Sequence, residues 1–108
     1  AEPFEKGPGG AWQARPLYLK GLAEPLLIAE CPDHGIPGKV WDGGLVLVEA
    51  FSANPSLVRG KRVLELGAGT ALVGAAAMAF GASEVLATDL EEHLPVIHGT
   101  MELNSHVA

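Results

Sequence analysis

The fold of this chain is decided by one stretch of sequence, which reads Val63-Leu64-Glu65-Leu66-Gly67-Ala68-Gly69-Thr70. It is a short apolar run that ends in a pair of glycines and leads into a long Ala-rich segment. Such a run is typical of a buried strand, and the glycines allow a tight turn between a strand and a helix. Because the first amides of a helix lack partners inside it, we expect free backbone N–H groups at this turn.

The segments around this turn alternate between strands and helices. Apolar residues recur at helical spacing over 43–53 and 94–103, and an Ala-rich run covers 70–80, so three helices are predicted. A second buried strand is predicted at 84–88, after the one at 63–66. Alternation of this kind predicts an α/β fold with a parallel sheet and helices on both of its faces.

The N-terminal region has a different character. Residues 1–16 are rich in Pro and Gly, which predicts a flexible leader. The apolar runs 17–20 and 26–30 predict a β-hairpin, with a helix as the alternative for the second run. We therefore divide the chain into the leader, a hairpin and loop over 17–37, and a ligand-binding part over 38–108.

The composition excludes several classes of protein. The chain has 108 residues, a formal charge of −6 and 48% hydrophobic residues, which fits one globular domain and disfavours nucleic acid as a partner. Its longest apolar stretch, 71–80, is half of the roughly 20 residues that a membrane span needs, so no membrane association is expected. A single cysteine, Cys31, cannot form an internal disulfide, so we expect a reducing compartment, the cytoplasm, with the nucleus left open.

An acidic residue follows the glycine turn at a characteristic separation along the sequence. Asp89 lies 22 residues after Gly67, at the end of the next predicted strand, where a carboxylate can accept hydrogen bonds from ribose hydroxyls. A dinucleotide fingerprint would need a small residue where Leu72 stands, and no phosphate-binding Lys-Ser or Lys-Thr pair follows the glycines. The four histidines show no metal-ligand spacing, so no metal site is expected. The pattern therefore indicates a site for a nucleoside-type cofactor.

Three segments, in this order, carry a resemblance to a known family: Val40-Trp41-Asp42, the Glu65–Thr70 motif and Thr88-Asp89-Leu90. They resemble the seven-strand S-adenosylmethionine-dependent methyltransferases, and most closely the protein-lysine methyltransferase branch of the methyltransferase-like 21 type. The resemblance covers roughly residues 38–104. It implies a Rossmann-like sheet of which this chain holds the N-terminal half, S-adenosylmethionine as cofactor, and a lysine side chain of a protein as methyl acceptor.

The resemblance also assigns roles in cofactor binding to individual residues. It implies that Trp41 packs on the cofactor and that Asp89 holds the ribose. Glu65 would orient the glycine loop or the amino group of the methionine tail. Three loop residues would approach the methionine portion of the cofactor, namely Gly67, Ala68 and Gly69. No residue of this chain matches the acceptor side of the branch, so the catalytic residues are left unassigned.

One departure from the branch and one alternative function stand beside this interpretation. Ala71 stands where the branch usually has a third glycine, which could tighten the methionine pocket. The alternative is a non-catalytic binding module that associates with another chain to complete its sheet. Its basis is that only two central strands are identified, where the complete fold has seven.

Overall fold

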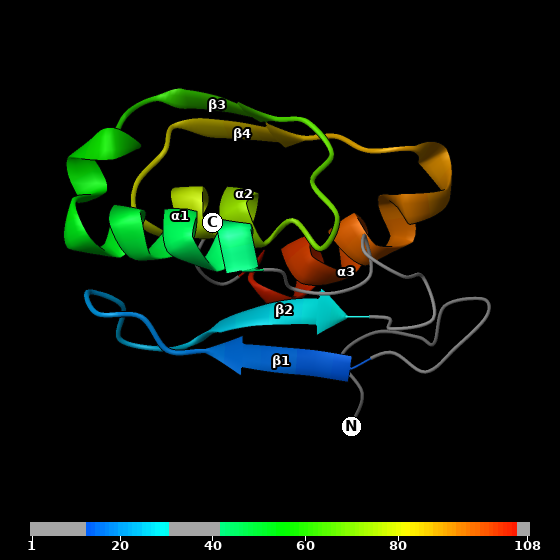
Figure 1. Cartoon of the computed structure of the whole chain (residues 1–108), viewed down its shortest axis with the longest axis horizontal. Helices are drawn as coiled ribbons and strands as arrows, with labels where there is room; N and C mark the ends of the chain where they lie inside the picture. Colours follow the sequence, from blue (N-terminus) through cyan, green and yellow to red (C-terminus); the bar gives the residue numbers. More distant parts are fainter. Residues whose placement is uncertain (1–12, 31–41, 106–108) are drawn as a thin grey trace.

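Helices form the middle layer of the molecule, between a β-hairpin on one side and a pair of parallel strands on the other (Figure 1). The computed structural model describes residues 13–30 and 42–105. Within these ranges the predicted order of strands and helices is confirmed. The result is a mixed α/β fold with one antiparallel and one parallel two-stranded sheet.

The hairpin consists of β1 (Gln13–Leu17) and β2 (Leu26–Glu30), paired antiparallel. The prediction of a strand for the second apolar run is confirmed, whereas the strand predicted at 17–20 is wrong in position. β1 lies earlier, largely within the stretch assigned to the leader. Four of its five residues are exposed, so β1 has no apolar pattern that could reveal it, and pairing with the buried β2 is what orders it.

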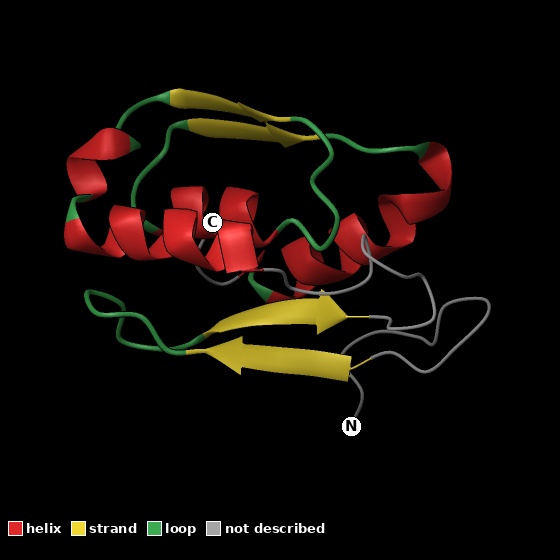
Figure 2. Cartoon of the chain, viewed as in Figure 1, coloured by secondary structure: helices red, strands yellow, loops and turns green. Residues whose placement is uncertain are grey.

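Three helices occupy the middle layer, and two short 3-10 turns precede a strand and a helix (Figure 2). All three predicted helices are confirmed. In the described ranges, none of the helices has both the length and the apolar content that a membrane crossing requires. The elements are α1 (Asp42–Ala53), η3 (Pro55–Leu57), α2 (Leu72–Ala79), η4 (Glu91–His93) and α3 (Leu94–Leu103).

The parallel sheet consists of β3 (Arg62–Glu65) and β4 (Glu84–Ala87), which confirms the predicted parallel pairing. Side chains alternate between its faces, so Val63 is half-buried toward the helices while Leu64 and Leu86 are 61% and 59% exposed. The described helices lie on one side of this sheet only (Figure 2). The expectation of helices on both faces, and of fully buried strands, is therefore wrong for the described residues.

The small residues of α2 let the helix approach its neighbours closely. Ala76 and Ala77 of α2 are fully buried in the main core, together with Ile28 of the hairpin and Val48 of α1. Larger side chains at these positions would force the helix away from its neighbours, because protein interiors are already close-packed. α2 therefore joins the hairpin to the parallel sheet.

Thr100 of α3 and Asn104, the residue that caps its C-terminus, complete the hydrogen bonding of the hairpin edge. The buried amide N–H of Ala29 donates to the hydroxyl of Thr100 over 2.9 Å, and that of Leu27 donates to Oδ1 of Asn104 over 2.9 Å. The side-chain amide of Asn104 also donates to the carbonyl of Leu27, so it acts as a peptide group of a neighbouring strand would. These hydrogen bonds fix the position of α3 relative to the hairpin.

Candidate functional site

The glycine loop begins where β3 ends. Gly67 and Gly69 adopt φ values of 64° and 59°, in the left-handed region that glycine enters without steric cost. A Cβ atom built at Gly67 would meet no described atom within 4 Å, so the backbone there borders open space. This left-handed conformation explains why glycine stands at both positions. The open space at Gly67 leaves room for a ligand against the backbone.

Two of the loop amides are already engaged within the protein. The amide of Ala68 donates to the carbonyl of Thr88 over 2.8 Å, and that of Gly69 donates to Oδ2 of Asp89 over 2.9 Å. The expectation of free amides is therefore wrong at these two positions. The physical reason is the parallel pairing of β3 and β4, which brings the two strand ends together so that one satisfies the other.

Asp89 is the polar centre of the site. Its side chain is 11% exposed, and its carboxylate accepts hydrogen bonds from the amides of Gly69 and Leu90. Burial by itself would raise the pKa of Asp89, but the bond from His93 and those from the two amides outweigh it and hold the pKa below its ordinary value. Asp89 is thus an ionised hydrogen-bond acceptor beside the glycine loop.

His93 belongs to this site, although its acidic neighbours in the sequence suggest a solvated helix face. Its side chain is 15% exposed, and its Nδ1 lies 2.9 Å from Oδ1 of Asp89. Because the carboxylate is ionised, the imidazole donates this bond. The four-residue spacing of Asp89 and His93, one helical turn, is the signal in the sequence that could have revealed the pair.

Glu65 reaches from the end of β3 into the first turn of α2. Its Oε1 accepts a hydrogen bond of 3.0 Å from the amide of Gly74, which has no partner within the helix. A Cβ at Gly74 would lie 2.8 Å from the same oxygen, so only glycine permits this contact. Burial raises the pKa of Glu65 from 4.5 to about 7, and the nearby charge of Asp89 adds to this effect.

Ala71 has a left-handed backbone conformation. Its φ is 61°, which is uncommon for a residue with a Cβ atom, and it directly precedes α2. Its methyl group is fully buried in a small core cluster with Ala68 and Ile97. The methyl group of Ala71 therefore packs inside the protein.

A hollow of about 340 Å³ lies beside the loop, in the range of small-molecule sites. It is lined by Gly43 and Gly44 of α1, by Glu65 and Gly67 at the end of β3, and by Val73 of α2. The structure therefore brings Glu65 and Gly67 to one cavity, with Gly69 and Asp89 joined by a hydrogen bond further along the loop. Trp41, predicted to pack on the cofactor, lies outside the described residues.

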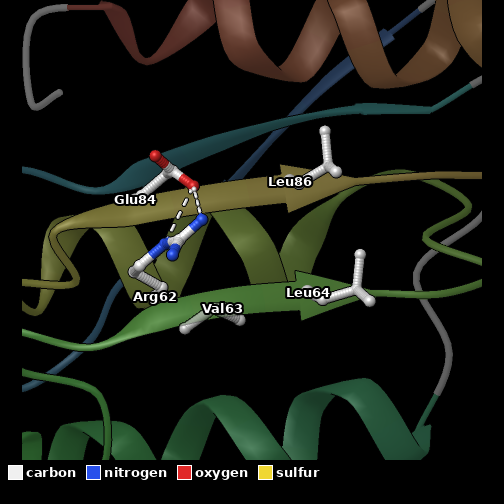
Figure 3. Close-up of a pocket in the computed structure, with 5 residues that line it drawn as sticks. All are labelled: Arg62, Val63, Leu64, Glu84 and Leu86. Carbon is white, nitrogen blue, oxygen red and sulfur yellow. Dashed lines mark hydrogen bonds and ion pairs between the residues drawn. The ribbon is translucent and has the colours of Figure 1, made fainter.

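A second hollow, of about 230 Å³, lies on the outer face of the parallel sheet (Figure 3). Arg62 and Glu84 form an exposed ion pair of 3.3 Å at one end of it, and Leu64 and Leu86 project beside them. Exposed ion pairs of this kind contribute little to stability. In the part of the chain that the structure describes, no group of three His, Cys, Asp or Glu side chains is placed to hold a metal ion.

The sequence of the chain is similar to that of a known protein family. The sequence profile of the lysine methyltransferase family matches residues 22–108, which includes the glycine loop and Asp89.

The chain belongs to the lysine methyltransferase family.

Individual members of the lysine methyltransferase family resemble parts of the chain. EEF1A lysine methyltransferase 3 of Mus musculus is 40% identical over 70 residues, which cover 65% of this chain and 30% of that protein. Protein N-lysine methyltransferase METTL21A of Danio rerio is 40% identical over 70 residues, or 65% of this chain and 32% of the relative. The electron transfer flavoprotein beta subunit lysine methyltransferase of Mus musculus is 45% identical over 51 residues, or 47% and 20%. The chain thus spans a third or less of these relatives.

Proposed function

We propose that this chain supplies the donor-binding part of an S-adenosylmethionine-dependent methyltransferase that modifies a lysine side chain of a protein. The observation that carries the proposal is the ionised carboxylate of Asp89 held against the amide of Gly69 in the glycine loop. The sheet of β3 and β4 would be part of a larger Rossmann-like sheet. Membership of the lysine methyltransferase family and the names of its relatives support protein lysine as the acceptor.

The residues of the site fit the cofactor. Asp89 would accept hydrogen bonds from the ribose, because this is the position at which carboxylates hold ribose hydroxyls in related sheets. The backbone at Gly67 and Gly69 would lie against the methionine portion. Ala68, which is buried in the small core cluster, would hold the loop in place. Glu65, which borders the same hollow as Gly67, would orient the amino group of the methionine tail.

The start of α2 does not support the alternative that the site binds a dinucleotide cofactor. Leu72 is the first residue of this helix and is 3% exposed in the main core, where a dinucleotide fingerprint would have a small residue for close approach. The leucine side chain thus packs inside the protein and holds the helix in place. We therefore propose a methyl donor in place of a nicotinamide cofactor.

The donor brings its own chemical activation, because its sulfonium group makes the methyl carbon electrophilic. The task of this chain is then to bind and orient the donor, which is the main contribution of a protein to such a transfer. Asp89 and the glycine loop would hold the nucleoside end, and Glu65 the amino-acid end. We propose the cytoplasm as the compartment in which this takes place.

Calorimetric titration of the 108-residue chain with S-adenosylhomocysteine tests the proposal. We expect binding by the unaltered chain, and a loss of about tenfold to a hundredfold in affinity for Asp89→Ala, because a charged acceptor is removed from the ribose. The matched control is Glu91→Ala, which removes an exposed carboxylate two residues away. Absence of binding by the unaltered chain, or equal affinity of the Asp89→Ala variant, would contradict the proposed function.

A further inference from the structure

The carboxylate of Asp89 is almost fully occupied by donors from its own chain. Its Oδ1 accepts from the amide of Leu90 over 2.7 Å and from Nδ1 of His93 over 2.9 Å. Its Oδ2 accepts from the amide of Gly69 over 2.9 Å. An ionised carboxylate has about four lone-pair positions, so one position is left, and it is on Oδ2.

A ribose presents two neighbouring hydroxyl groups, and holding both on one carboxylate requires two acceptor positions. One of the three donors of the protein must then lose its hydrogen bond to Asp89. The amide of Gly69 belongs to a loop that is held by the adjacent bond of Ala68 to Thr88, and the amide of Leu90 is covalently next to Asp89. The imidazole of His93 is different, because it can leave by rotation about its own side-chain bonds.

We propose that His93 competes with the ribose of the methyl donor for Oδ1 of Asp89, and that the imidazole turns away when the donor binds. The inference rests on the proposed function, and it makes His93 a positioning residue that sets donor affinity through Asp89. In the absence of donor, His93 satisfies the carboxylate and holds η4 and the start of α3 against the loop.

Calorimetry with S-adenosylhomocysteine at pH 8 tests this inference in two variants. His93→Leu removes the competing donor, so we expect about threefold to tenfold tighter binding than in the unaltered chain. His93→Asn keeps a side-chain donor near the position of Nδ1, so we expect affinity close to that of the unaltered chain. The matched control is His98→Leu, at an exposed histidine of α3, which should leave the affinity unchanged.

The 2′-deoxy analogue of S-adenosylhomocysteine separates competition from a general effect on structure. One hydroxyl needs only the position left on Oδ2, so the gain from His93→Leu should shrink toward onefold with this ligand. Weaker or equal binding of S-adenosylhomocysteine by His93→Leu, beside normal binding by the unaltered chain, overturns this inference alone. Failure of the unaltered chain and every variant to bind contradicts the proposed function and the inference with it.

Discussion

At the scale of single residues, Gly60 and Gly67 have similar backbone conformations. Substituting each of them can therefore distinguish an effect on folding from an effect on ligand binding. Their φ values are 73° and 64°, and a Cβ built at either would meet no described atom within 4 Å. Alanine at either position would therefore bring the same left-handed strain without a clash. Only Gly67 belongs to the loop beside the hollow.

We expect Gly60→Ala and Gly67→Ala each to lower the free energy of unfolding by about 1 kcal/mol, since an L-residue pays roughly this amount for the left-handed conformation. Chemical denaturation measures this cost. Calorimetry with S-adenosylhomocysteine should show reduced affinity for Gly67→Ala alone, because the added methyl group occupies space that the donor would use. Equal affinity in the two variants would count against contact between the donor and Gly67.

Glu65 makes the stability of the protein dependent on pH. Burial raises the pKa of its carboxyl group from 4.5 to about 7 in the folded state. Between these values the folded state retains a proton that the unfolded state has lost, so stability falls as the pH rises from about 4.5 to about 7. Above this window the group is ionised in both states and the cost stays constant.

We expect Glu65→Gln to remove this dependence, because glutamine can still accept the bond from Gly74 but carries no charge. At pH 8 its free energy of unfolding should exceed that of the unaltered chain by about 1 to 2 kcal/mol, and at pH 4 the two should agree. Urea denaturation across this range is the measurement, with the exposed Glu91→Gln as the control. A stability of the unaltered chain that does not change between pH 4.5 and pH 7 would contradict the expectation.

At the scale of elements, Thr100 of α3 and Asn104 at the end of this helix serve as the second neighbour of β2. Thr100 is fully buried, and its hydroxyl accepts the amide of Ala29 in the protein interior. Nothing in the sequence distinguishes this threonine from a surface residue, because its partner lies 71 positions away. Only the packing of α3 against the hairpin reveals that the two form a unit.

We expect Thr100→Val to cost about 1 to 3 kcal/mol of stability, since it leaves a buried amide without an acceptor at nearly unchanged side-chain volume. Hydrogen exchange followed by NMR should show faster exchange of the Ala29 amide in this variant. Thr100→Ser keeps the hydroxyl and should preserve the protection of that amide relative to its neighbours. Similar exchange of Ala29 in the valine and serine variants would show that the hydroxyl is not its acceptor.

The elements themselves differ in how far they could be predicted. α2 and α3 can be predicted because an Ala-rich composition and helical recurrence are local signals. β1 was placed wrongly because it is exposed, so its residues carry no apolar alternation and its position depends on β2. Strand pairing between distant segments is a tertiary property that local composition does not report.

On the scale of the whole molecule, the layers place all described helices on one face of the parallel sheet (Figure 1). The other face exposes Leu64 and Leu86 at 61% and 59%. Apolar runs at these strands look alike whether one face or both are covered, so the sequence pattern suggested a fully buried sheet. Leu64 and Leu86 are exposed because the described helices all lie on the opposite face of this sheet.

The sequence by itself determined the alternating strands and helices, the glycine turn and the acid at the end of the next strand. These are local properties, set by backbone conformation and by the period of apolar residues. Only the tertiary structure decided that Gly69 binds Asp89 and that Glu65 binds Gly74. The reason is that β3 and β4 pair in parallel and α2 packs against both, which brings together groups that are not neighbours along the chain.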